Sequence, residues 1–210
     1  MQSFFSTSTK KKLLAFVFFL APLVAFSQDG NITSAPGNKR AQSCPMAYIG
    51  LSTGINNETG LLGFNIDIPV LSSLSIGAGA GLSSWGTKVY GEVRYYLAPC
   101  QRGWAFGAGI THNTGLSNFN TQMETISNTQ EPVVLNLNPQ SNAFIKVYRF
   151  WNLGRAKNRF YTAFGWSVPI TTPSYDQLAG EPLSQNSINE MKILEPGGLV
   201  LSLGFSFGLH

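Results

Sequence analysis

The sequence predicts an all-β protein, an eight-stranded antiparallel up-and-down transmembrane β-barrel. Three observations predict it: the pattern of the C-terminal strand, seven further segments with the same pattern, and two long connectors that both fall on the same side of the barrel. Residues 197–210 (GGLVLSLGFSFGLH) place Leu and Phe on one face of a strand and small or weakly polar residues on the other. Lipid requires this apolar-out arrangement over about ten residues. A soluble barrel or sandwich, the alternative, would carry an apolar belt larger than water tolerates.

The N-terminal segment has the layout of an export signal. Lysines occupy positions 10–12, an apolar stretch covers 13–26, and small residues precede Gln28. We therefore expect residues 1–27 to be a signal peptide that is removed and residues 28–43 to be a polar periplasmic tail before the barrel, 44–210. A membrane anchor is the alternative, but 14 apolar residues fall short of the roughly 20 that a spanning helix needs.

The charge balance argues against a nucleic-acid partner. The chain has 14 basic and 10 acidic residues, and removal of the three signal lysines leaves 11 basic residues. A nearly neutral chain lacks the basic surface that nucleic acid requires. No later apolar run approaches the length of a spanning helix, so a membrane location requires a closed barrel.

The first four predicted strands follow the tail. In the first three, Ile, Leu and Phe alternate with Gly, Ser, Asn and Asp, which places Asp67 in the interior. The fourth is the most informative, because Lys88, Glu92 and Arg94 share its inward face while Val and Leu point outward. These strands are expected over 46–55, 61–70, 74–83 and 87–97.

The last four predicted strands repeat the pattern. The fifth alternates Trp, Phe and Ile with Ala and Gly, and the sixth points Lys146 inward between two aromatic residues. The seventh alternates Phe, Trp and Val with Tyr, Ala, Gly and Ser, and the eighth is the C-terminal strand. They are expected over 104–114, 142–151, 159–168 and 197–210.

Connector lengths indicate the orientation. The connectors 116–141 and 169–196 are long and polar, and the others are short. Bacterial barrels have short periplasmic turns and longer outer loops, so an even strand number places both long connectors outside. The first contains an alternating patch, 132–137 (PVVLNL), which either offers an edge to a partner strand or pairs within its own loop, and we favour the second.

Aromatic residues cluster near two of the predicted periplasmic turns. Their outward members are expected to form the girdle that marks a membrane interface, although aromatic residues are also common in strands generally. The predicted girdle residues are Tyr95, Trp104, Phe106, Trp151 and Phe160.

With this pattern, residues 46–210 resemble the small outer-membrane β-barrels of the OmpA/OmpX type found in Gram-negative bacteria. The terminal LSLGFSFGLH is similar to the C-terminal signal of such proteins, although it ends in His210 rather than in an aromatic residue. The resemblance implies an outer-membrane location, contact with lipid and lipopolysaccharide, and recognition by the barrel-assembly machinery through the last strand. The anchoring role of longer relatives is not implied, because no peptidoglycan-binding domain follows the barrel.

Five inward charges are the main candidates for a functional interior. Asp67, Lys88, Glu92, Arg94 and Lys146 fall inside a barrel that is only wide enough for side chains to fill. Buried charges must pair or they are costly. We expect an ion-pair network that closes the lumen, and a narrow pore is the alternative.

His112 and Thr114 are the only candidates for catalysis. The segment 112–115 (HNTG) faintly resembles the His-x-Ser-Asn motif of outer-membrane lipid A deacylases, in which histidine activates a serine. Threonine and glycine replace the serine and asparagine, and no acidic partner is evident. We therefore expect His112 to be a polar residue of the outer rim.

Cys44 and Cys100 are candidates for a disulfide in an oxidising compartment. One precedes the first strand and the other follows the fourth, so the two lie roughly across the barrel. Pairing requires Cα atoms within about 7 Å, and the sequence leaves this open.

The prediction is thus an outer-membrane barrel without catalytic activity, metal or cofactor. Its outer loops are expected to carry recognition, adhesion or assembly, with a partner that the sequence does not name. A deacylase-like enzyme using His112 and a narrow pore are the alternatives.

Overall fold

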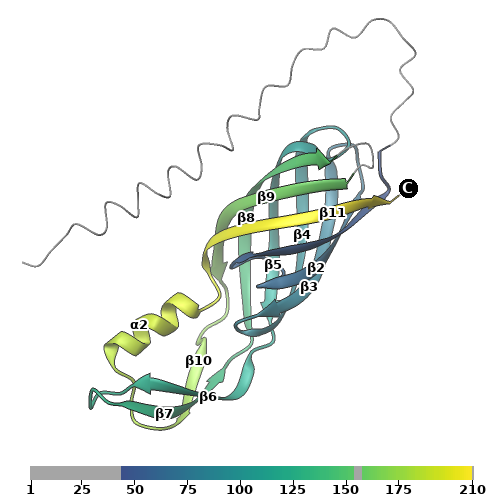
Figure 1. Ribbon diagram of the computed structural model, residues 1–210. Helices are drawn as coiled ribbons and strands as arrows, with labels where there is room; N and C mark the ends of the chain where they lie inside the picture. Colours follow the sequence, from purple (N-terminus) through teal and green to yellow (C-terminus); the bar gives the residue numbers. More distant parts are fainter. Residues whose placement is uncertain (1–43, 154–157, 210) are drawn as a thin grey trace, which may run out of the picture. The chain divides into compact units, whose positions relative to one another are not determined.

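Eight antiparallel strands close into a barrel, as the sequence predicts (Figure 1). The protein is known from a computed structural model that describes residues 44–153 and 158–209. The predicted signal peptide (1–27), the predicted tail (28–43) and His210 lie outside these residues. The order around the barrel is β1-β11-β9-β8-β5-β4-β3-β2. The strands are β1 (Ala47–Ile55), β2 (Leu62–Pro69), β3 (Leu74–Ser83), β4 (Gly86–Ala98), β5 (Arg102–Asn113), β8 (Gln140–Leu153), β9 (Asn158–Pro169) and β11 (Gly198–Leu209).

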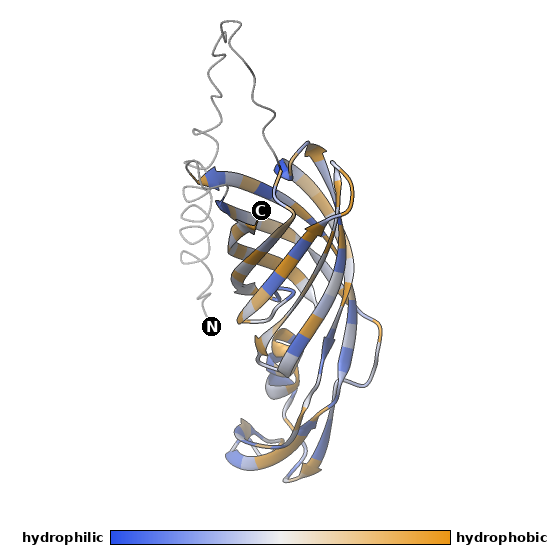
Figure 2. Cartoon of the chain, turned by 90° about the vertical axis from the view of Figure 1, so that its right-hand side faces the viewer, coloured by the Kyte–Doolittle hydropathy of each residue, from blue (hydrophilic) through white to orange (hydrophobic). Residues whose placement is uncertain are grey.

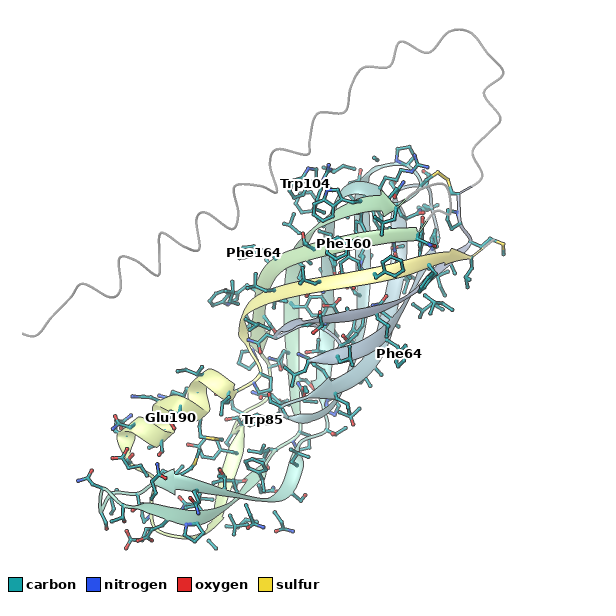
Figure 3. All side chains as sticks on the ribbon, in the orientation of Figure 1. Phe64, Trp85, Trp104, Phe160, Phe164 and Glu190 are labelled. Carbon is teal, nitrogen blue, oxygen red and sulfur yellow. A yellow bond between two sulfur atoms is a disulfide. The ribbon has the colours of Figure 1, made fainter. Side chains whose placement is uncertain are left out.

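Side chains alternate between the exterior and the interior along each strand. In β4, every second residue from Lys88 to Tyr96 is buried, and the residues between them are exposed. Figure 2 shows the same alternation as bands of contrasting hydropathy along the strands. Large apolar residues point outward, as Phe64 and Phe164 do in Figure 3. Large apolar side chains therefore cover the exterior of the barrel, and the charged side chains of its strands are buried in the interior together with an aromatic cluster.

The first and last strands close the barrel. β1 pairs with β11 over nine residues, and this pairing places Ile49 opposite Phe207 and Leu51 opposite Phe205. The two C-terminal phenylalanines pack edge to face, with ring centroids 4.8 Å apart. The predicted alternation of 197–210 thus belongs to the strand that completes the sheet.

The two ends of the barrel differ in their connections. At the end that we call the turn end, β2 joins β3, β4 joins β5 and β8 joins β9 through short turns. At the other, the loop end, the two short connectors span 56–61 and 84–85, and the two long ones span 114–139 and 170–197. Both long connectors thus lie at the same end, as predicted.

The long connectors form an ordered unit, which we call the outer sheet. Its strands β6 (Leu116–Glu124) and β7 (Gln130–Leu137) lie in the first connector, and β10 (Tyr175–Ala179) lies in the second. The order is β10-β7-β6. The alternating patch 132–137 therefore pairs within its own loop, as expected, and also with the other loop. The short helix α2 (Gln185–Leu194) follows β10.

The outer sheet has a hydrophobic core of its own. Val133 and Leu135 of β7 are fully buried there, and Met191 of α2 packs against them. Ser184 caps α2 by accepting a hydrogen bond from the Ser187 amide. The barrel also contributes to this core. Trp85 in the β3–β4 connector packs into it and donates its indole N–H to the Asn138 carbonyl at 3.1 Å (Figure 3). Among the described residues no helix is long and apolar enough to cross a membrane.

Candidate functional site: the charged interior and the loop end

Six charged side chains form one continuous chain inside the barrel, in which basic and acidic groups alternate. We call it the ion-pair chain. Arg159 contacts Asp67, whose Oδ2 lies 3.4 Å from Arg94 Nη1. Arg94 Nη2 lies 3.0 Å from Glu92 Oε2, which is 3.7 Å from Lys146 Nζ. Lys146 Nζ then lies 2.6 Å from Glu58 Oε2, so the order is Arg159, Asp67, Arg94, Glu92, Lys146 and Glu58.

Strand phase positions five members of this chain. Asp67 of β2, Glu92 and Arg94 of β4, Lys146 of β8 and Arg159 of β9 all occupy buried positions of their alternating strands. Because the barrel is narrow, inward groups from different strands come within contact distance of one another.

Glu58 reaches the chain from outside the strands. It lies in the β1–β2 connector at the loop end, is 1 % exposed and accepts a hydrogen bond from the Ser202 hydroxyl at 3.2 Å. Burial raises the pKa of its carboxyl, but attraction by Lys146 and Arg94 outweighs burial, so the pKa lies below its ordinary value. Glu58 is therefore ionised at neutral pH and completes the chain.

Tyrosines and a glycine fit around the carboxylates. The Tyr148 hydroxyl lies 2.7 Å and 2.8 Å from the two oxygens of Glu92, and Tyr96 donates to Asp67 Oδ2 at 2.7 Å. A Cβ atom at Gly107 would overlap the Glu92 carboxylate and approach Tyr148 Cε2 to 2.8 Å. The absence of a side chain at Gly107 thus makes room for two buried side chains.

The structure brings four of the five predicted charges into direct contact. Asp67, Glu92, Arg94 and Lys146 belong to the ion-pair chain, whereas Lys88 is buried but not a member. Sequence reasoning missed two members. Arg159 could have been found, because it has the same phase as the inward Tyr161. Glu58 could not, because residues of a connector have no strand phase.

Cys44 and Cys100 form a disulfide, with Cα atoms 5.1 Å apart. The two cysteines were expected on opposite sides of the barrel, and the β4–β5 turn, which carries Cys100, spans that separation. Its Gln101 is 1 % exposed, and the Gln101 carbonyl accepts from Arg159 Nη1 at 3.3 Å. The turn therefore folds over the turn end of the barrel rather than away from it.

The predicted girdle residues face outward at the turn end. Tyr95, Trp104 and Phe106 are each about half exposed, and Trp151 and Phe160 pack together with ring centroids 5.7 Å apart. The structure adds a cation to this band. The Arg149 guanidinium lies 5.4 Å from the Trp104 ring and 5.8 Å from the Trp151 ring. Trp104 is labelled in Figure 3.

His112 lies on the outer surface of β5 near the loop end and contacts a serine of the neighbouring strand. Its Nδ1 is 2.9 Å from Ser141 Oγ, and the two residues are directly opposite in the β5–β8 pair. Thr114, the candidate in the sequence, instead accepts a hydrogen bond from the Thr87 amide. Among the described residues, no hydrogen bond or ion pair joins His112 to a carboxylate.

Comparison with known proteins returns no matching family model, no matching curated protein and no matching solved structure.

Proposed function

We propose that the protein is an integral outer-membrane β-barrel of the OmpA/OmpX type, without catalytic activity. In this proposal the loop end is extracellular, and the outer sheet with α2 carries recognition, adhesion or assembly. The observation that supports it is the reversed polarity of the barrel: seven charged side chains are buried inside, and large apolar side chains are exposed outside.

The apolar exterior is continuous around the barrel. Phe64 is 69 % exposed, Ile145 66 % and Phe164 59 %, and these residues lie on three different strands. Soluble monomers rarely expose apolar patches larger than a few hundred Å². Lipid is the solvent in which such a surface is stable, and it also matches the strand lengths and the aromatic band.

The outer sheet is proposed as the functional surface because it projects polar groups from a folded unit. Asn120 and Gln122 of β6 and Asp176 of β10 are exposed on it. β6 and β10 are also its edge strands. Such edges present backbone hydrogen-bonding groups to a partner.

The first test is gel mobility with and without boiling, on protein recovered from purified outer membranes. A faster band before boiling is expected of a closed barrel that resists detergent. A single unshifted band from a soluble fraction would contradict the proposal.

A matched pair of variants tests the lipid contact itself. Ile145→Arg places a charge at the centre of β8, where lipid would make it cost about 2–4 kcal/mol. Ile126→Arg places the same charge on the outer sheet, at a residue of similar exposure, 63 %. We expect the first variant to accumulate less in the membrane and the second to match the wild type. Equal behaviour of the two variants would refute a lipid-facing barrel.

Ester hydrolysis at the outer rim is the second candidate function, favoured by the His112–Ser141 contact. If the protein has this activity, expression of the wild type should change the acylation of lipid A. Expression of Ser141→Ala or of His112→Ala should leave the acylation unchanged. Unchanged lipid A profiles in both variants would leave the contact a structural hydrogen bond.

A further inference from the structure

The ion-pair chain is neutral, and one buried cation is left over. It contains three basic and three acidic groups, since Arg159, Arg94 and Lys146 balance Asp67, Glu92 and Glu58. Lys88 is the seventh buried charge among the described residues and is 4 % exposed. No hydrogen bond or ion pair within the described part of the chain involves its ammonium group.

Glu58, the carboxylate whose charge acts on Lys88, has its closest contacts elsewhere. Its Oε2 lies 2.6 Å from Lys146 Nζ and accepts a hydrogen bond from Ser202. An ammonium group that is removed from water without a counter-charge is costly. The described residues place no carboxylate within ion-pair distance of the Lys88 ammonium group, so a negative partner bound there would stabilise its charge.

A small cavity lies beside Lys88 at the loop end. Its volume is about 30 Å³, enough for one or two water molecules or one small ion. Ser84, which is exposed, stands at its edge, and Ser83 and Asn113 add polar atoms. The lining residues are Gly54, Asn56, Gly60, Leu61, Ser83, Ser84, Lys88, Asn113 and Pro196.

We infer that this cavity is a binding site for a small inorganic anion of the size of chloride or nitrate, held by Lys88. The anion neutralises the one unmatched charge of the interior. Its size is limited by the cavity, and its charge is set by the single cation.

The inference does not depend on insertion into a membrane and can be tested on the folded barrel in detergent. The unfolding midpoint is measured at constant ionic strength while sodium gluconate, whose anion does not fit, is replaced by sodium chloride or sodium nitrate. A ligand that binds only the folded state raises the folding equilibrium constant about elevenfold at ten times its Kd. We expect this increase for wild type and for Lys192→Met, in which an exposed lysine of α2 is removed. We expect none for Lys88→Met or Lys88→Gln.

A second measurement needs no variant. Broadening of the chloride-35 nuclear magnetic resonance line by the wild-type barrel is expected, with reversal by nitrate but not by gluconate. The inference is overturned if the wild-type midpoint does not respond to chloride at constant ionic strength, or if Lys88→Met responds as the wild type does. The first result would mean that water alone occupies the cavity, and the second that the anion binds elsewhere on the protein.

Discussion

Asp67 is the residue on which the interior depends most directly. It contacts both Arg94 and Arg159 and accepts a hydrogen bond from Tyr96. It therefore joins strands β2, β4 and β9 through one carboxylate. Loss of one partner from a buried pair costs more than the pair contributes, because the opposite charge stays buried.

We expect Asp67→Asn to destabilise the barrel by about 3–5 kcal/mol, measured as the urea midpoint of tryptophan fluorescence in micelles. Asn is of similar size, so the loss reports charge rather than packing. Glu190→Gln, on the exposed face of α2, is the control and should change stability by less than about 0.5 kcal/mol. Equal midpoints for the two variants would show that the arginines find other partners.

Glu58 predicts how stability depends on pH. The pKa of Glu58 is lower in the folded barrel than its ordinary value of 4.5. The stabilisation of the fold by the ionised carboxylate is therefore complete above about pH 4.5. The stabilisation is lost as the pH falls through the lower folded pKa. We expect Glu58→Gln to be less stable than wild type at pH 7 and to lose less stability on acidification. A pH titration of the unfolding midpoint checks this, and parallel curves would contradict it.

At the scale of single residues, the sequence was most informative where a strand sets the phase. The inward positions of Asp67, Glu92, Arg94 and Lys146 follow from a period of two. The contacts among these residues depend on the register between strands that are distant in the chain. The alternation within one strand does not predict that register. Lys88 shows the consequence, since it has the right phase but lies outside the ion-pair chain.

At the scale of elements, the barrel strands were predictable and the outer sheet was not. The barrel strands alternate over eight residues or more, whereas β6 (LSNFNTQME) has a single buried residue, Met123. The outer sheet also takes β7 and β10 from different connectors, so no local signal identifies their pairing. Helix α2 left a weak signal in the Ser184 cap and in Ile188 and Met191, which are three residues apart.

Trp85 tests whether the outer sheet is held by the barrel. It is 1 % exposed, and removal of such a side chain costs about 3–5 kcal/mol. We expect Trp85→Ala to make residues 116–137 and 175–194 sensitive to protease while the gel-mobility shift of the barrel persists. Ile126→Ala, at an exposed position of the same unit, is the control and should remain resistant. Loss of the mobility shift in Trp85→Ala would show that the two parts unfold together.

At the scale of the whole molecule, the disulfide ties the start of β1 to the β4–β5 turn. It closes a loop with a sequence separation of 56 residues. The chain-entropy model assigns about 4 kcal/mol to a loop of this length. We expect reduction to lower the urea midpoint of the wild type and to leave Cys44→Ser/Cys100→Ser unchanged. A midpoint that does not respond to reductant would show that the β1 end is held by its strand pairs alone.

The pairing of β1 with β11 sets the order in which the protein can be built. The first strand has no partner on one side until the last has been synthesised, and β7 in the same way has no partner on one side until β10 has been synthesised. A chain of this topology therefore carries unpaired edges, and needs protection from aggregation, until its final residues arrive. A truncation that removes β11 would thus leave an open, adhesive sheet rather than a smaller barrel.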